Sequence, residues 1–365
     1  MSVRILLAAG GTGGHVYPAI AIADALKVAR PDLSILFAGT RAHMEWTAVP
    51  KAGYAITSIW ISGLIRRMTI QNLLFPLKLM VGLAQSLGIL MRYRPDLVVS
   101  CGGYVAGPIG WMAAKRGVPV VVQEQNSYPG VTNRMLGKHA ERVYVAYAEA
   151  AAYFPARHVR LTGNPVRATL AVADRSEALR RFGFDPDRKT LLVMGGSGGA
   201  LRINDAMLAS VEALHEQIGL NILWQCGPRY HAPVAAALDL DAYPRLRLLP
   251  FIDSMAEAYA VADLVLCRSG AGTIAELTVT GKPMILVPSP HVAGDHQTRN
   301  AIAMADAGAA VLVADGDLTS HLLPTVSGLL ADPTTLTAMS AASAALAKPD
   351  AAAVIAADIL SLIDA

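Results

Sequence analysis

The sequence is poor in cysteine and in charge, and each shortage argues against a class of protein. Its three cysteines, Cys101, Cys226 and Cys267, lie far apart without metal-ligand spacing, so we expect small core residues in a reducing compartment. Only 16% of the residues are charged, the net charge is +3, and no run of one sign occurs, which argues against a nucleic-acid partner. The 53% of hydrophobic residues exclude a disordered chain, and 365 residues suit two domains.

The sequence also lacks the pattern of a secretory signal or of a transmembrane helix. The apolar run 5–9 stops at Gly10 without a cleavage-site pattern, so no signal peptide is expected. The most apolar stretch, Leu73 to Met91, is interrupted by Pro76 and Lys78, whereas a spanning helix needs about 20 mostly apolar residues. We therefore expect no membrane span, although this stretch could lie on a membrane surface.

Short apolar runs, each ending in glycine or a turn residue, alternate with segments of helical spacing. The runs are Val3–Ala9, Leu33–Gly39, Leu97–Cys101, Val118–Gln123, Val143–Tyr147, Thr190–Gly195, Asn221–Cys226, Leu246–Pro250, Leu264–Cys267, Met284–Val287 and Ala310–Val313. Their nearly continuous Val, Ile and Leu are typical of parallel strands covered by helices on both faces. Pro18–Ala29, Ile203–Gln217 and Asn300–Ala307 have helical spacing. The pattern predicts an α/β protein with two doubly wound halves.

The break between the halves is predicted near Gly163-Asn164-Pro165-Val166, where glycine, asparagine and proline favour a turn. We therefore expect a first domain over residues 1–166 and a second over 167–349. The last helical pattern, Ala351 to Ile363, follows a Lys-Pro-Asp turn. This helix, expected over about residues 350–365, could pack on either domain, the first included.

Two glycine-rich turns stand at matching places, each after the first strand of its half. The first is Gly10-Gly11-Thr12-Gly13-Gly14, followed by His15, and the second is Gly195-Gly196-Ser197-Gly198-Gly199. Glycines at a strand–helix turn let backbone N–H groups approach a phosphate, and the positive end of the helix dipole favours its charge. One such turn is weak evidence, because tight packing also uses glycine. Two together favour a phosphate-bearing ligand held between the halves.

Two further turns of this kind are Gly102–Pro108 and Arg268–Thr273, the latter leading into a helix with Glu276. In open α/β sheets ligands bind beyond the carboxyl ends of the strands, where all four turns are expected. No lysine of the Walker type follows any of them, which argues against an ATPase. The G-x-G-x-x-G spacing and its later acidic partner are also missing, which argues against a dinucleotide-dependent oxidoreductase.

Taken in order, these turns and their neighbours resemble the MurG family of bacterial UDP-N-acetylglucosamine transferases, which belongs to glycosyltransferase family 28. The matching segments are Gly10–His15, Ile61–Leu64, Gly102–Pro108, Glu124–Asn126, Gly163–Arg167, Gly195–Ala200, Phe251–Met255, Cys267–Glu276 and Asp295–Ala301. They occur in family order and cover nearly the whole chain. Two positions depart from the pattern. Gln123 replaces the usual histidine, so no role of that histidine carries over, and Gly198 replaces a frequent glutamine after Ser197.

The resemblance implies the GT-B fold, two Rossmann-like domains facing across a cleft. It also implies inverting transfer of GlcNAc from UDP-GlcNAc to the 4-hydroxyl of MurNAc in undecaprenyl-diphospho-MurNAc-pentapeptide. That reaction converts lipid I into lipid II in peptidoglycan synthesis and so serves cell-wall growth, cell shape and division. Neither a cofactor nor a metal is implied, and no Asp-x-Asp triad in the chain fits a metal-assisted version.

The resemblance assigns donor binding mainly to the second domain. Ile252 would meet the uracil through its backbone, Glu276 the ribose hydroxyls, and Gln297, with His296 beside it, the sugar hydroxyls. From the sequence alone, Ile252 equally suits a core position, and Glu276 equally suits compensation of a helix dipole. The implied donor set is Thr12, Gly13, Gly14, Asn126, Arg167, Ser197, Ile252, Ala271, Gly272, Thr273, Ile274, Ala275, Glu276 and Gln297.

The acceptor and the catalytic base are assigned to the first domain. The implied acceptor set is Thr12, Gly13, Gly14, Gly103, Tyr104 and Gly107. Removing the proton of the attacking hydroxyl needs a base, and His15 is the first choice because a histidine pKa can lie near the working pH. A ligand-positioning donor is the alternative role for His15. Glu124 is the second candidate for the base.

The implied acceptor is lipid-linked, which gives the segment from Ile61 to Met91 a possible role. Its leucines and Phe75 are interspersed with Arg66, Arg67 and Lys78, the pattern of a helix lying on anionic lipid. An ordinary buried helix is the alternative. With the resemblance, we expect a peripheral enzyme on the cytoplasmic face of the bacterial inner membrane, near other cell-wall synthesis or division proteins.

Three other functions remain open at this point. The chain could be another GT-B transferase with a soluble acceptor, or a UDP-sugar epimerase. It could also be a non-catalytic sensor that binds a nucleotide sugar without turnover. The four glycine-rich turns, together with His15, Glu276 and Gln297, favour the lipid I transferase.

Overall fold

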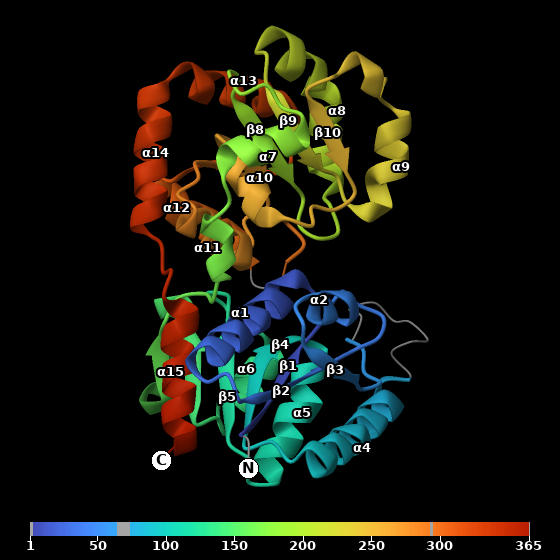
Figure 1. Ribbon diagram of the computed structural model, residues 1–365, viewed down its shortest axis with the longest axis vertical. Helices are drawn as coiled ribbons and strands as arrows, with labels where there is room; N and C mark the ends of the chain where they lie inside the picture. The colour runs from blue at the N-terminus through green and yellow to red at the C-terminus, as the bar shows by residue number, and fades with distance from the viewer. Residues whose placement is uncertain (1–2, 64–73, 293–294, 365) are drawn as a thin grey trace. The chain divides into compact units, whose positions relative to one another are not determined.

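The computed structural model describes residues 3–63, 74–292 and 295–364, and the chain forms two compact units (Figure 1). One unit comprises Met1–Arg167 together with Pro349–Ala365, and the other comprises Ala168–Lys348. The chain therefore leaves the first unit after Arg167 and returns to it for its last residues.

The first unit is built on a parallel sheet of seven strands in the order β3-β2-β1-β4-β5-β6-β7. The strands are β1 (Arg4–Ala9), β2 (Ser34–Gly39), β3 (Ala55–Ser58), β4 (Leu97–Gly102), β5 (Val120–Glu124), β6 (Arg142–Val145) and β7 (Val159–Leu161). Every residue of β4 and β5 is buried, which explains why their sequences show no polar alternation. The strand order reverses between β1 and β4, the place where doubly wound sheets bind ligands.

Helices cover both faces of this sheet. They are α1 (Gly13–Ala29), α2 (Glu45–Lys51), α4 (Phe75–Tyr93), α5 (Gly103–Lys115), α6 (Val131–Leu136) and α15 (Ala351–Asp364), with short 3₁₀ turns at Ala148–Tyr153 and Ala156–His158. The C-terminal helix α15 lies beside α1 (Figure 1), where Ile355 and Ile359 join the core that contains Ile22 and Leu26. The helix is also tied to β6, because the Tyr144 hydroxyl donates to an oxygen of Asp358 at 2.8 Å.

The second unit repeats the design with a parallel sheet of six strands in the order β10-β9-β8-β11-β12-β13. Its strands are β8 (Thr190–Met194), β9 (Asn221–Gln225), β10 (Leu246–Leu249), β11 (Leu264–Cys267), β12 (Met284–Leu286) and β13 (Ala310–Leu312). Its helices are α7 (Arg175–Phe182), α8 (Leu201–Glu212), α9 (Pro228–Ala236), α10 (Met255–Val261), α11 (Ala271–Val279), α12 (His296–Asp306), α13 (Leu318–Ala331) and α14 (Pro333–Ala345). Shorter turns occupy Ala168–Ala171, Ala213–Gln217 and Leu240–Ala242.

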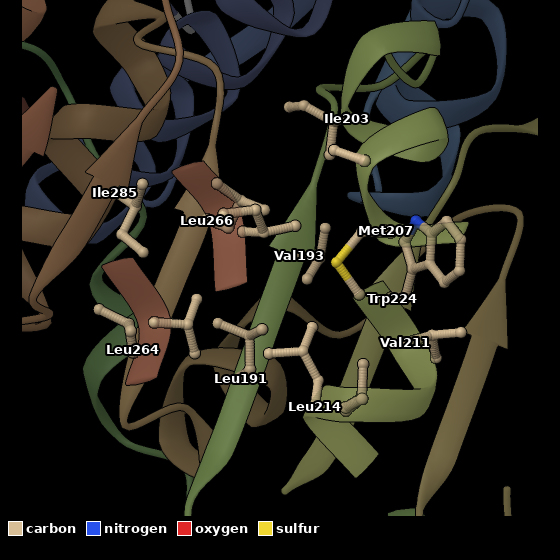
Figure 2. Packing of buried hydrophobic residues seen from close by; sticks show 14 of the residues in the cluster. Leu191, Val193, Ile203, Met207, Val211, Leu214, Trp224, Leu264, Leu266 and Ile285 are labelled. Atoms are coloured by element: carbon tan, nitrogen blue, oxygen red, sulfur yellow. The ribbon is translucent and has the colours of Figure 1, made fainter. Parts of the chain in front are cut away.

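The core of the second unit shows why its strands and helices carry these residues. Figure 2 shows Met207 of α8 directed toward Val193 of β8, with the indole of Trp224 nearby, and all three side chains are fully buried. The indole N–H is satisfied inside the core, since it donates to the Asn204 side chain at 3.1 Å. Burying each such apolar side chain stabilises the unit by roughly 1.5–3 kcal/mol.

The predicted strands are all present, with ends within two residues of those expected from the sequence. Two strands were not predicted, β3 and β7, and both form edges of the first sheet. Most of their residues are partly or fully exposed, so the continuous apolar signal that marks a buried strand is missing. Within the described ranges, no helix is long and apolar enough to cross a bilayer.

Candidate functional site

The first glycine turn joins β1 to α1 at the carboxyl end of the sheet. Gly11 has a φ of 92°, in the left-handed region that favours glycine. Thr12 caps the helix, and its carbonyl accepts from the N–H groups of His15 and Val16 at 3.1 and 3.2 Å. Thr12 and Gly14 are exposed, so the start of α1 is open to a ligand. This arrangement suits an anion, because free N–H groups and the helix dipole meet there.

His15 stands on the first turn of α1, with Nδ1 3.1 Å from the Thr12 hydroxyl. Burial lowers its pKa from 6.5 to about 4, although the negative charge of Glu45 acts in the opposite direction. The pKa therefore lies below the ordinary histidine value that made His15 the first choice, because desolvation outweighs the nearby charge. At neutral pH the imidazole is neutral and can accept a proton.

The third glycine turn, between β4 and α5, packs against the first. A Cβ on Gly103 would lie 2.2 Å from the Gly10 carbonyl oxygen, and one on Gly102 would lie 2.5 Å from Cδ2 of His15. Both glycines also have positive φ values, 80° for Gly103 and 98° for Gly102. Glycine is needed at these positions for two reasons, and the structure thus brings Gly103 against Gly10 and Gly102 against His15. Tyr104, the next residue, is 52% exposed.

Glu124 ends β5 and holds the loop that follows. Its Oε1 accepts from the backbone and side-chain N–H groups of Asn126 at 2.9 and 3.2 Å. Its Oε2 accepts from the Gly130 N–H at 3.2 Å and from the Asn133 side chain at 2.9 Å. Burial raises the pKa of Glu124, while these hydrogen bonds to the charged form act against the increase. With both oxygens occupied, the carboxylate anchors its loop.

Gln123 is fully buried, and its amide donates to the Asn164 side chain at 3.2 Å. Asn164 in turn donates to the Gln125 carbonyl at 3.1 Å. These bonds join the end of β5 to the segment that leads to Arg167, whose guanidinium lies 4.8 Å from the ring centre of Tyr17. The departure at Gln123 therefore leaves a hydrogen-bonded polar core.

Gly107 lies on α5, where a Cβ would contact Thr132 at 3.4 Å.

The second glycine turn joins β8 to α8 in the second unit. A Cβ on Gly199 would lie 2.0 Å from the Cys226 carbonyl oxygen, so this turn packs against the one after β9. Gly196 has a φ of 83°, and its carbonyl accepts from the Gln225 side chain at 2.9 Å. Ser197 and Gly198 are exposed at the tip. This turn therefore presents its backbone and the Ser197 hydroxyl to solvent.

The fourth turn leads from β11 into α11, and hydrogen bonds to residues of α12 hold it in place. The Ser269 hydroxyl donates to the Gln297 carbonyl at 2.8 Å, and the Asn300 side chain donates to the Ser269 carbonyl at 3.1 Å. Ala271 is the first residue of α11, with Gly272 and Thr273 partly exposed behind it. The structure thus brings the predicted Gln297 close to this turn. Its side-chain oxygen accepts from the Ser289 N–H at 2.8 Å.

The remaining predicted donor residues differ in exposure. Ile252 and Ile274 are each 3% exposed, so only their backbone groups are offered to a ligand. Ala275 and Glu276 are partly exposed on α11. Within the part of the chain that the structure describes, no group of three or more His, Cys, Asp and Glu side chains is arranged to hold a metal ion.

Two residues near these turns were missed from the sequence, Glu45 and Tyr259. The Tyr259 hydroxyl donates to Oε2 of Glu276 at 2.7 Å, and the Glu45 carboxylate accepts from the Gly11 N–H at 3.1 Å. Each lies on another helix than the residue it supports, far from it along the chain. Neither has a local sequence signal, because a glutamate or a tyrosine on a short helix usually belongs to its surface or its core.

Family models match both units of the chain. The Glycosyltransferase family 28 N-terminal domain matches residues 5–145, and the Glycosyltransferase family 28 C-terminal domain matches residues 190–355. The chain is 47% identical over 367 aligned residues to the UDP-N-acetylglucosamine--N-acetylmuramyl-(pentapeptide) pyrophosphoryl-undecaprenol N-acetylglucosamine transferase of Salinibacter ruber, covering 100% of this chain and 99% of the relative. A protein of the same name from Bacteroides fragilis is 42% identical, covering 99% and 96%.

The chain belongs to the MurG family. Among solved structures, the crystal structure of Acinetobacter baumannii MurG is similar, with a TM-score of 0.72 and 29% identity over 99% of this chain and 100% of that one. The two parallel sheets confirm the predicted fold class of the MurG-family chain, α/β with two Rossmann-like domains. The roles of its individual site residues remain predictions.

Proposed function

We propose that this chain transfers GlcNAc from UDP-GlcNAc to the 4-hydroxyl of MurNAc in undecaprenyl-diphospho-MurNAc-pentapeptide, converting lipid I into lipid II in peptidoglycan synthesis. The observation that carries the proposal is 47% identity, over the full length of both chains, to a transferase named for this reaction. The open glycine-rich turns at the carboxyl ends of both sheets support it, because donor and acceptor each carry a diphosphate.

The donor binds on the second unit. Backbone N–H groups at the start of α11, from Ala271 to Thr273, and the Ser197 hydroxyl hold the diphosphate of UDP. The Ile252 backbone meets the uracil, while Glu276 accepts hydrogen bonds from the ribose. Gln297 binds the sugar hydroxyls through the amide group that its contact with Ser289 leaves available. Ile274 and Ala275, also on α11, are the remaining donor contacts on this unit.

The acceptor binds on the first unit. Its diphosphate lies at the open start of α1, formed by Thr12, Gly13 and Gly14, beside the turn that carries Gly103. The exposed ring of Tyr104 contacts the sugar or the peptide. Gly107 has no side chain, which leaves room for the acceptor beside the first turns of α5. Asn126 and Arg167, also on the first unit, stay predicted contacts of the donor.

His15 is the base for the attack. The acceptor 4-hydroxyl gives its proton to Nε2, since Nδ1 faces the Thr12 hydroxyl. The oxygen forms a bond to the anomeric carbon as the bond from that carbon to UDP breaks on the opposite face. An α-linked donor thereby gives a β-linked product. The departing diphosphate keeps the electron pair and is stabilised by backbone N–H groups.

The enzyme works peripherally, on the cytoplasmic face of the inner membrane. Leu77 and Met80 of α4 are 46% and 62% exposed, and Trp60 beside them is 47% exposed. Lys78 lies between them, 5.8 Å from the centre of the Trp60 ring. Exposed apolar side chains with a basic neighbour suit an anionic lipid surface. The predicted Arg66 and Arg67 lie outside the described residues.

A mass-resolved transfer assay tests the proposal. The purified chain is incubated with UDP-GlcNAc and a short-chain polyprenyl-diphospho-MurNAc-pentapeptide. The expected product is the acceptor with one N-acetylhexosamine added, together with UDP. Folded protein that binds UDP but adds no sugar to this acceptor contradicts the proposal. Transfer to a soluble acceptor alone, or epimerised UDP-sugar without transfer, identifies one of the alternative enzymes.

A further inference from the structure

Glu45 is a buried carboxylate under the first glycine turn, and the proposed reaction gives it no part so far. Its side chain is 0% exposed. Oε2 accepts from the Gly11 N–H at 3.1 Å, and Oε1 accepts from the N–H and the hydroxyl of Thr40 at 2.9 and 2.7 Å. A buried glutamate is costly unless its charge is satisfied, and here three uncharged donors satisfy it.

Two glycines make room for this side chain. A Cβ on Gly10 would lie 2.8 Å from Oε1 of Glu45, and a Cβ on Gly39 would lie 2.6 Å from its Cγ. Neither glycine has a positive φ, so the backbone does not itself require glycine there. The ends of β1 and β2 are therefore shaped around the carboxylate. Such a fit indicates a role at this turn beyond filling the core.

The carboxylate is linked to His15 through the turn and through its charge. It holds the N–H of Gly11, the residue before Thr12, and the Thr12 hydroxyl lies 3.1 Å from Nδ1 of His15. The same charge raises the pKa of His15 against the lowering effect of burial. A negative charge that favours the protonated imidazole also favours any step in which that imidazole gains a proton.

We propose that Glu45 is a positioning residue for the transfer, which fixes the turn that presents His15 and stabilises the imidazolium formed in the reaction. This inference rests on the proposed function. In that step the acceptor O–H bond breaks, and its proton bonds to Nε2 of His15. The oxygen bonds to the anomeric carbon, and UDP leaves with the electron pair. Because Glu45 is already buried in place, no reorganisation is needed when the charge on His15 appears.

The main test is Glu45→Gln in the full chain, with Glu212→Gln as the control. Glu212 is an exposed carboxylate on α8, so the control changes the net charge equally. We expect kcat for Glu45→Gln to fall at least about ten-fold, a typical scale for weakened general-base catalysis. The KM for UDP-GlcNAc and the Kd for UDP should change less than about two-fold, because Glu45 lies on the first unit and the proposed UDP contacts lie on the second.

Two further measurements separate positioning from a purely structural role. Glu45→Asp keeps the charge and should retain several-fold more activity than Glu45→Gln. In an amide-resolved NMR experiment, hydrogen exchange at Gly11 should accelerate in Glu45→Gln, since its acceptor is replaced. Thr40→Val removes one donor to Oε1 with little change in shape. It should lower kcat in the wild-type background and have no further effect with Glu45→Gln.

The outcomes distinguish this inference from the proposed function. Absence of transfer by the wild-type chain contradicts the proposed function. Active wild type with unchanged kcat in Glu45→Gln overturns the role of Glu45. Equal activity of the Asp and Gln variants overturns the charge contribution. If Glu45→Gln does not fold, Thr40→Val decides, and an unchanged kcat in that variant overturns the inference.

Discussion

The hydroxyl of Tyr259 donates a hydrogen bond to Oε2 of Glu276 at 2.7 Å, from α10 to α11. Tyr259 is 1% exposed, whereas Glu276 is partly exposed. A buried tyrosine thus holds one oxygen of a carboxylate whose residue reaches the surface. The orientation of the proposed ribose ligand is therefore set from inside the second unit.

Tyr259→Phe removes this bond and leaves the ring in place. We expect KM for UDP-GlcNAc to rise roughly three- to ten-fold, about 1 kcal/mol, with kcat little changed. The reason is that Glu276 loses one of the hydrogen bonds that orient it before the donor binds. Steady-state kinetics and calorimetric UDP titration measure the effect, with Tyr230→Phe on α9 as the matched control. A KM equal to that of the wild type contradicts this role for Tyr259.

The low pKa of His15 gives the reaction a distinctive pH dependence. In the proposed mechanism the free base of His15 is the active form, so kcat/KM should rise through a pKa of about 4 and stay level above it. At pH 5 a base with that pKa is about 90% neutral, whereas one with the ordinary histidine pKa is about 3% neutral. Rates between pH 4.5 and 8, with circular dichroism confirming the fold, provide the test. An inflection near 6.5 would show that the base titrates as an ordinary histidine.

His15→Gln should abolish the base and leave donor binding intact. We expect a fall in kcat of about 10²–10⁴-fold, the usual contribution of a positioned base. The Kd for UDP should stay unchanged, because the proposed contacts of the donor diphosphate lie on the second unit. Single-turnover kinetics measures the first quantity and calorimetry the second. Full activity in His15→Gln would assign the proton to another group.

Glu124→Gln should destabilise the loop after β5. The new amide would place an N–H group toward N–H donors from Asn126, Gly130 and Asn133, and unmet hydrogen bonds of this kind cost about 1–3 kcal/mol. Hydrogen–deuterium exchange of residues 125–136 should accelerate, and the thermal midpoint should fall. Glu212→Gln is the exposed control. Unchanged exchange in this segment contradicts the anchoring role.

Gly103→Ala should damage the meeting of the first and third turns. The added Cβ would lie 2.2 Å from the Gly10 carbonyl oxygen, at a φ of 80°. Gly117→Ala is a matched control, because its φ is 73° but its Cβ meets nothing within 4 Å. In the control, the left-handed strain alone should lower the free energy of unfolding by about 1–2 kcal/mol. Gly103→Ala should lower the free energy of unfolding by clearly more. Equal thermal midpoints for the two variants would contradict the close approach.

The sequence predicted the buried parts of the fold well, because burial on both faces leaves an unmistakable pattern. Runs such as Leu97–Cys101 can belong only to a covered element. The edges were missed for the converse reason. Leu161 in β7 is 63% exposed, and a three-residue strand with exposed side chains looks like a loop.

Only those parts of the candidate site whose residues are neighbours in the sequence could be predicted. Each glycine turn is local, so its strand–helix context could be recognised in the sequence. Glu45 and Tyr259 act across space, and nothing in their neighbours marks the partner. The lowered pKa of His15 was not predictable for the same reason, because it depends on burial in the folded chain.

The helix α15 has a consequence for how the protein is made. Its Ile355 and Ile359 are both fully buried in the first unit, although they follow the whole second unit along the chain. During synthesis, residues 168–348 are complete before that core can close. The second unit is therefore free to fold first, and the unit that carries His15 is finished only once α15 has left the ribosome.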